Sequence, residues 1–100
     1  MFTLTNINNL LKQINKTIPI IEENYKKNPI PMLGDILKKY QEAKDLIEHS
    51  TIEELKKNSF RLKNKLNDRT RAYLEAASDY MNPMLEDMYK TEQILKDFLS

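Results

Sequence analysis

The segment Ser78–Tyr89 reads SDYMNPMLEDMY, and its Asn-Pro pair interrupts a run of Tyr and Met residues at helical spacing. Asn82 and Pro83 favour the start of a new helix, because asparagine is a good N-cap and proline costs little at the first helical position. We therefore expect a short break or a sharp kink over residues 80–82.

The apolar residues around this segment favour the opposite interpretation, because they keep one helical phase through the proline. The stripe consists of Ile52, Leu55, Leu62, Leu66, Tyr73, Ala77, Tyr80, Met84, Met88, Leu95 and Phe98. The sequence predicts helices over residues 52–80 and 83–99, with a single bent helix as the alternative. A straight helix of that length would extend for about 70 Å.

The clearest helix start lies further upstream, at Thr51-Ile52-Glu53-Glu54. Thr51 can accept a hydrogen bond from the backbone of Glu54, and the Glu54 carboxylate can reach back to the backbone of Thr51. This capping box predicts a turn near the middle of the chain. A helix over residues 32–49 precedes the turn.

The first predicted helix covers residues 4–27 and carries an apolar face that is nearly the heptad seam of a coiled coil. Its phase continues past Pro19, which predicts a kink there rather than an end. Asn28-Pro29-Ile30-Pro31 is a firm break, because the residue before each proline prefers extended backbone.

These elements predict an all-α fold. We expect a single domain over residues 1–100, an antiparallel helical bundle or long helical hairpin of three to four helices. Folding about the central turn pairs residues whose numbers sum to about 101, which places Pro19 and Pro83, the two predicted kinks, at one level. A chain of 100 residues with a single glycine has few positions for tight β-hairpins.

The composition excludes several kinds of chemical site and bears on the cellular compartment of the protein. The chain has no cysteine, which excludes disulfides, thiolate metal sites and a cysteine nucleophile. Its N-terminus lacks the basic start and the apolar run of a signal peptide, and nothing approaches the length of a membrane span. We expect a cytoplasmic protein. The 10 asparagines, and the dominance of lysine over arginine, indicate an AT-rich genome, as in a low-GC bacterium or its phages.

The ionisable side chains give little support to catalysis. His49 is the only histidine, whereas a metal site needs several converging ligands. Glu75 and Asp79 form a carboxylate pair one helical turn apart, but they lie off the apolar stripe and favour a solvated face over an acid–base pair. We expect no enzyme, no cofactor and no metal.

A basic segment precedes an acidic one in the second half of the chain. The basic residues are Lys56, Lys57, Arg61, Lys63, Lys65, Arg69 and Arg71. They could contact a polyanion, but they surround the helix rather than follow one face, so nucleic-acid binding is the less favoured interpretation. The order of the two segments instead favours self-association. In an antiparallel pair, the basic segment of each chain would lie beside the acidic segment of the other, and we expect a dimer.

The Tyr/Met residues are the predicted protein-binding site, because both residue types are common in adaptable interfaces. They are Tyr80, Met81, Met84, Met88 and Tyr89. Most of them are in phase with the core stripe, so a plain core is the simpler alternative. Met81 and Tyr89 lie off its centre and are the strongest predictions for contact with a partner.

The sequence therefore predicts a non-enzymatic interaction module of the adaptor, inhibitor, immunity or antitoxin type, which self-associates and binds another protein. Two alternatives are a small nucleic-acid-associated regulator and a secreted helical hairpin like those of the WXG100 family. The second shares the length and the central turn, but the chain has no tryptophan and therefore no Trp-x-Gly turn.

Overall fold

The computed structural model describes residues 3–99, and every regular element among them is an α-helix. The helices are α1 (Leu4–Lys27), α2 (Pro31–Glu48), α3 (Ile52–Lys57), α4 (Ser59–Leu66), α5 (Arg69–Ala77) and α6 (Met84–Leu99). The all-α prediction is confirmed, but the described residues form more helical segments than the three to four that were expected.

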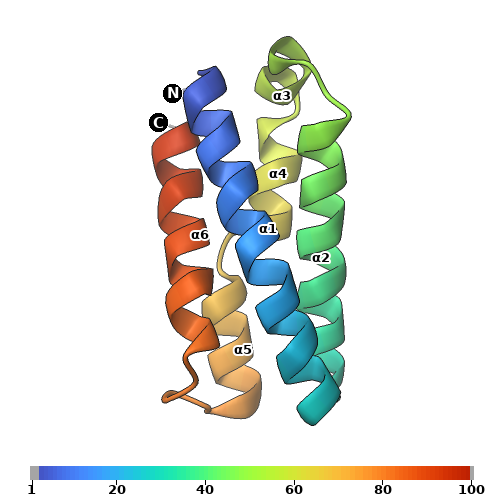
Figure 1. Cartoon of the computed structure of the whole chain (residues 1–100), viewed down its shortest axis with the longest axis vertical. Coiled ribbons are helices and arrows are strands. Elements are labelled where there is room, and N and C mark those ends of the chain that lie inside the picture. The colour runs from blue at the N-terminus through green and yellow to red at the C-terminus, as the bar shows by residue number, and fades with distance from the viewer. Residues whose placement is uncertain (1–2, 100) are drawn as a thin grey trace.

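The helices stand side by side along one long axis (Figure 1). The short helices α3, α4 and α5 follow one another down a single column, and α1, α2 and α6 form the neighbouring columns. Successive columns run in opposite directions, and α6 packs mainly on α1 while α2 lies diagonally opposite α6. The principal extents are 38 × 21 × 20 Å, so the chain is far shorter than a continuous helix over its second half would be.

The helix starts follow local sequence. Thr3 accepts a hydrogen bond from the backbone of Asn6 at 3.1 Å, and Pro31 opens α2. The capping box is confirmed: Thr51 accepts from the Glu54 backbone at 3.1 Å, and the Glu54 carboxylate accepts from the Thr51 backbone at 3.0 Å. These hydrogen bonds lower the pKa of Glu54.

Proline has different effects at its two predicted kinks. α1 continues through Pro19, whose ring lies on an exposed surface of the helix. A new helix, α6, begins after Pro83, and the Asn82 side-chain oxygen accepts from the Met84 backbone at 2.9 Å. Asn82 thus acts as the N-cap, which settles the question posed by the Asn-Pro pair.

The predicted continuous helix over residues 52–80 is wrong. The column breaks at Asn58, again at Asn67 and Asp68, and ends at Ala77. Asn58 bonds its side chain back to the Glu54 carbonyl at 3.0 Å, a competing interaction that favours helix ends. Asp68 has left-handed backbone (φ 60°), which interrupts the α-helical hydrogen bonding.

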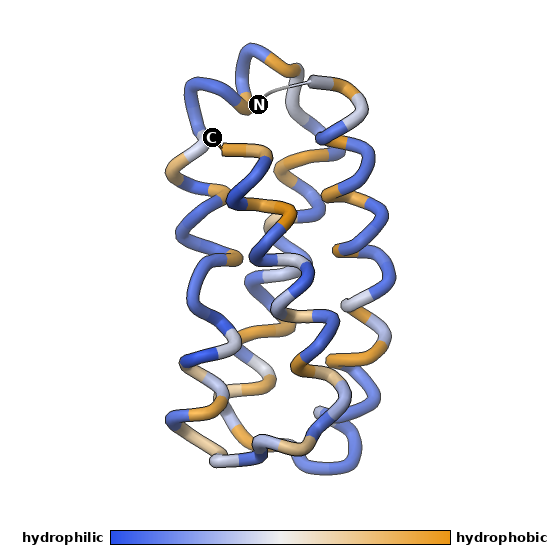
Figure 2. The backbone as a smooth tube through the Cα atoms, turned by 90° about the vertical axis from the view of Figure 1, so that its left-hand side faces the viewer, coloured by the Kyte–Doolittle hydropathy of each residue, from blue (hydrophilic) through white to orange (hydrophobic). Residues whose placement is uncertain are grey.

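The core runs the full length of the molecule between the columns. Apolar residues recur along each helix between hydrophilic ones, as Figure 2 shows. The largest fully buried side chains are Tyr40, Tyr73, Phe98, Leu10, Ile14, Ile21, Leu33, Ile36, Leu55, Leu62, Leu66 and Met84. They come from all of the columns, so no helix can leave without exposing part of this core.

Candidate functional site

Three of the predicted partner-binding residues reach solvent beside the start of α6. Tyr80 is 68% exposed, Met81 is 92% exposed and Tyr89 is 55% exposed. Tyr80 and Met81 lie in the connection between α5 and α6, and Tyr89 lies on the second turn of α6. We call these three residues the Tyr/Met patch.

The other two predicted partner residues are in the core, so their prediction as contact residues is wrong for this structure. Met84 is 1% exposed and Met88 is fully buried. They lie one helical turn apart on the face of α6 that also carries Leu95. Burial of this face against the other columns is more favourable than leaving it in water.

The connection that carries the patch is held by a set of hydrogen bonds. The Asn82 amide donates to Asp79 at 2.9 Å and to the Asn24 side chain on α1 at 2.7 Å. Tyr73 donates its hydroxyl to Asp79 at 2.9 Å. Burial and the Asp79 carboxylate raise the pKa of the Tyr73 hydroxyl. The apolar side chains of the patch are thus presented by a connection anchored to both α5 and α1.

Two hollows that share Tyr89 follow one another along α6. Tyr89 lines a hollow of about 380 Å³ at the patch and a second of about 500 Å³ toward the end of α6. The first is lined by Leu74, Tyr80, Met81, Asn82, Pro83, Leu85, Glu86 and Tyr89. The second is lined by Lys63, Asn67, Tyr89, Glu92, Gln93, Leu95, Lys96 and Leu99. We call this surface between α6 and the α4–α5 column the α6 groove.

The predicted polyanion-binding residues do not form a single face. They are distributed over α3, α4 and α5. Three of them interact within the chain. Lys65 lies 3.5 Å from Glu42 on α2, Arg71 pairs with Asp68 and Glu75, and Arg69 donates to the Asn67 carbonyl at 3.1 Å.

The remaining four, Lys56, Lys57, Arg61 and Lys63, are exposed at the α3–α4 end of the column. Of these, Lys63 lines the α6 groove.

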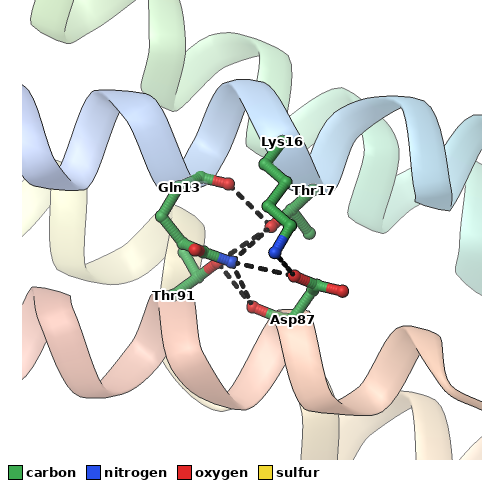
Figure 3. A network of polar contacts seen from close by, with 5 residues as sticks. All are labelled: Gln13, Lys16, Thr17, Asp87 and Thr91. Carbon is green, nitrogen blue, oxygen red and sulfur yellow. Dashed lines mark hydrogen bonds and ion pairs between the residues drawn. The ribbon is translucent and has the colours of Figure 1, made fainter.

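A buried polar network joins α1 to α6 (Figure 3). The Gln13 amide donates to the Thr17 hydroxyl at 3.1 Å and to the Asp87 carbonyl and side chain at 3.2 and 3.3 Å. The Thr17 and Thr91 hydroxyl oxygens lie 3.2 Å apart. Lys16 adds an ion pair with Asp87 at 3.4 Å on the outer side.

This network was missed from the sequence, although a signal for it exists. Gln13, Thr17 and Thr91 sit in phase with the apolar stripes of their helices and are at most 6% exposed. Polar side chains at such positions need partners, and those partners come from a helix 74 residues away in sequence. The network fixes how α6 lies on α1.

A second polar cluster fills the break between α4 and α5. The Glu92 carboxylate accepts hydrogen bonds from the backbone of Asp68 at 2.8 Å and of Thr70 at 3.2 Å, and also from the Thr70 hydroxyl. Glu92 therefore supplies the cap that the first turn of α5 lacks locally. Carboxylates also suit the positive end of a helix.

Tyr40 lies beside these clusters with its side chain fully buried. Its hydroxyl is buried and accepts or donates no hydrogen bond within the described part of the chain. Burial raises the pKa of this hydroxyl strongly, and the nearby Thr91 hydroxyl offsets only part of that effect.

The described residues contain no group of three or more His, Cys, Asp or Glu side chains able to hold a metal ion. His49 is exposed at the end of α2, where its backbone donates to the Asp45 carbonyl at 3.0 Å. Across residues 3–99, no helix combines the length and apolar character needed to cross a bilayer.

A family model described as "YeeD uncharacterised protein" matches residues 5–99, which include nearly all of the described helices. The chain belongs to the YeeD family. A relative from Bacillus subtilis (strain 168), "Uncharacterized protein YeeD", is 51% identical over 89 residues, which cover 89% of this chain and 88% of the relative. No solved structure matches the chain. The Tyr/Met patch and the α6 groove lie inside the segment that matches the YeeD family.

Proposed function

We propose that this YeeD-family chain is a non-enzymatic protein–protein interaction module. It would serve as an adaptor, inhibitor, immunity-type or antitoxin-type regulator built as a self-associating antiparallel bundle, with the Tyr/Met patch as its contact surface. The observation that carries the proposal is the position of Met81, which is 92% exposed beside Tyr80 on an anchored turn, with Tyr89 lining the same hollow.

The turn that carries Met81 favours binding beyond the exposure of its side chain alone. Single exposed apolar residues are common on protein surfaces, but adjoining ones beside a hollow are typical of contact sites. Tyrosine and methionine give such sites a large contact area and an adaptable shape. Because Asn82 and Asp79 already fix the connection, little ordering would oppose binding.

The polar side chains support this class of function over catalysis. The Thr17 and Thr91 hydroxyls donate to carbonyls of their own helices at 2.7 and 2.8 Å. The Thr70 hydroxyl donates to Glu92. These groups stabilise the helix contacts, whereas a nucleophile would need an adjacent base and access to substrate.

Site-specific photo-cross-linking tests the proposal. A benzophenone side chain placed at Tyr80 should give a discrete adduct in the source cell, and the additional Met81→Ser substitution should greatly reduce its yield. The matched control carries the same probe at Lys38, an exposed position on α2, away from the patch. The proposal fails if Tyr80 gives no adduct, or if both probe positions give the same set of adducts.

A further inference from the structure

We infer that a second copy of this chain binds along the α6 groove, antiparallel to the first and related to it by a two-fold axis near Tyr89. This inference rests on the proposed function, because it identifies the protein that covers the Tyr/Met patch. Two observations support it: apolar side chains at both ends of the groove, and opposite charge at its two ends.

The groove offers apolar anchors at both of its ends. Phe60 lines neither hollow, but it is 60% exposed on α4 one helical turn before Lys63, and it therefore lies beside the end of the groove remote from the patch. Tyr80 and Met81 occupy the patch end, and Tyr89 lies between the two hollows. In an antiparallel pair, Phe60 of each copy faces the patch end of the other.

Charge follows the same polarity. Lys63 and Lys96 line the end near Phe60, where the acidic lining residue is Glu92, whose carboxylate caps α5. Glu86 lines the patch end, and Glu75, which pairs with Arg71, is exposed on nearby α5. A parallel pair would bring like charges together at both ends. An antiparallel two-fold pair brings the basic end of each copy to the acidic end of the other, and this match occurs twice.

The charge polarity is specific to this side of α6. The hollow on the opposite side of α6 does not have this polarity, because Lys12, Lys16 and Lys90 line it with Asp97 as its acidic residue.

Charge reversal tests the pairing by sedimentation velocity. The wild-type protein should sediment as a dimer of two chains of 11.9 kDa each. Reversal of one end, by Lys63→Glu with Lys96→Glu or by Glu75→Lys with Glu86→Lys, should raise the dissociation constant at least about tenfold. An equimolar mixture of the two variants should recover the dimer, because each variant then meets the opposite charge at both ends.

The matched control is Lys12→Glu with Lys90→Glu, which makes the same charge change in the other hollow and should leave the dimer intact. Circular dichroism checks that every variant keeps the helical content of the wild type. The inference is overturned if the wild type is a monomer at every concentration, or if the control pair dissociates the dimer as strongly as the groove variants do.

An introduced cysteine tests the position of the axis, because the natural chain has none. Under mild copper–phenanthroline oxidation, Tyr89→Cys should form a disulfide-linked dimer, whereas Lys38→Cys on α2 should not, since a disulfide needs Cα atoms within about 7 Å. A Tyr80 cross-link to a different protein, with monomeric wild type and no Tyr89→Cys dimer, would remove this inference and the self-association, and would leave the proposed binding of another protein through the Tyr/Met patch standing. Absence of every cross-link would remove both.

Discussion

At the scale of single residues, Tyr40 gives the most direct test of the polar interior. Its hydroxyl is buried without a hydrogen-bond partner, and such a group costs stability relative to an apolar one of the same shape. We expect Tyr40→Phe to raise the free energy of unfolding by about 1 kcal/mol at pH 7. Urea unfolding followed by circular dichroism measures the change. Tyr80→Phe, at an exposed site, should change it by less than about 0.5 kcal/mol.

Tyr40 also predicts how stability changes at alkaline pH. Burial raises the pKa of its hydroxyl above the ordinary tyrosine value near 10. Below that value the group is neutral in both states and contributes nothing. Above it, the unfolded chain loses a proton that the folded chain retains, so stability falls as the pH rises.

We therefore expect the advantage of Tyr40→Phe over wild type to grow between about pH 10 and 11. The measurement is urea unfolding over a pH series in that range. A constant difference across the series would contradict the assigned burial effect.

At the scale of the elements, the start of α6 separates two roles within one dipeptide. Asn82 caps α6 through its side-chain oxygen and ties the turn to Asn24, so we expect Asn82→Ala to cost about 1–2 kcal/mol. Pro83 is exposed directly before α6, where its missing backbone N–H costs no helical hydrogen bond, so Pro83→Ala should change stability by less than about 0.5 kcal/mol. Thermal unfolding compares them, and a large gain for Pro83→Ala would contradict the separate helix.

The break between α4 and α5 predicts an effect over a long sequence separation. Glu92→Ala removes the acceptor for two backbone N–H groups and the Thr70 hydroxyl, and we expect a cost of about 2–3 kcal/mol. The control is Glu22→Ala, an exposed carboxylate on α1 away from the α6 groove, with an expected cost below about 0.5 kcal/mol. Equal costs for both variants in denaturant unfolding would show that Glu92 does not cap α5.

These elements also show what the sequence could and could not predict. The capping box at Thr51 was predictable because its partners lie three residues apart. The exposure of Tyr89 on α6 was predictable from its helical phase, whereas Met81 lies in the connection before α6, where helical phase does not decide exposure. The break at Asp68 was not predictable in the same way, because its compensating partner, Glu92, is 24 residues distant in sequence. The burial of Gln13 likewise depends on α6, so a local pattern could not show that its amide would be paired.

At the scale of the whole molecule, the columns should differ in local stability. α1 is a continuous helix of 24 residues joined to α6 by the buried network, whereas α3, α4 and α5 are short and interrupted. Local opening requires less free energy where helices are short and depend on distant caps. We therefore expect native-state hydrogen exchange to show faster exchange of the central amides of α4 and α5 than of the central amides of α1.

The Glu92→Ala variant makes this prediction specific to the cap. Loss of the cap should accelerate exchange in the first turn of α5 more than in α1, because the α1–α6 contact through Gln13 does not involve Glu92. Glu22→Ala should leave the exchange of both helices nearly unchanged. If Glu92→Ala instead accelerated amide exchange equally in all columns, the molecule would open only as one cooperative unit. The α4–α5 column that borders the α6 groove would then not open separately from the rest.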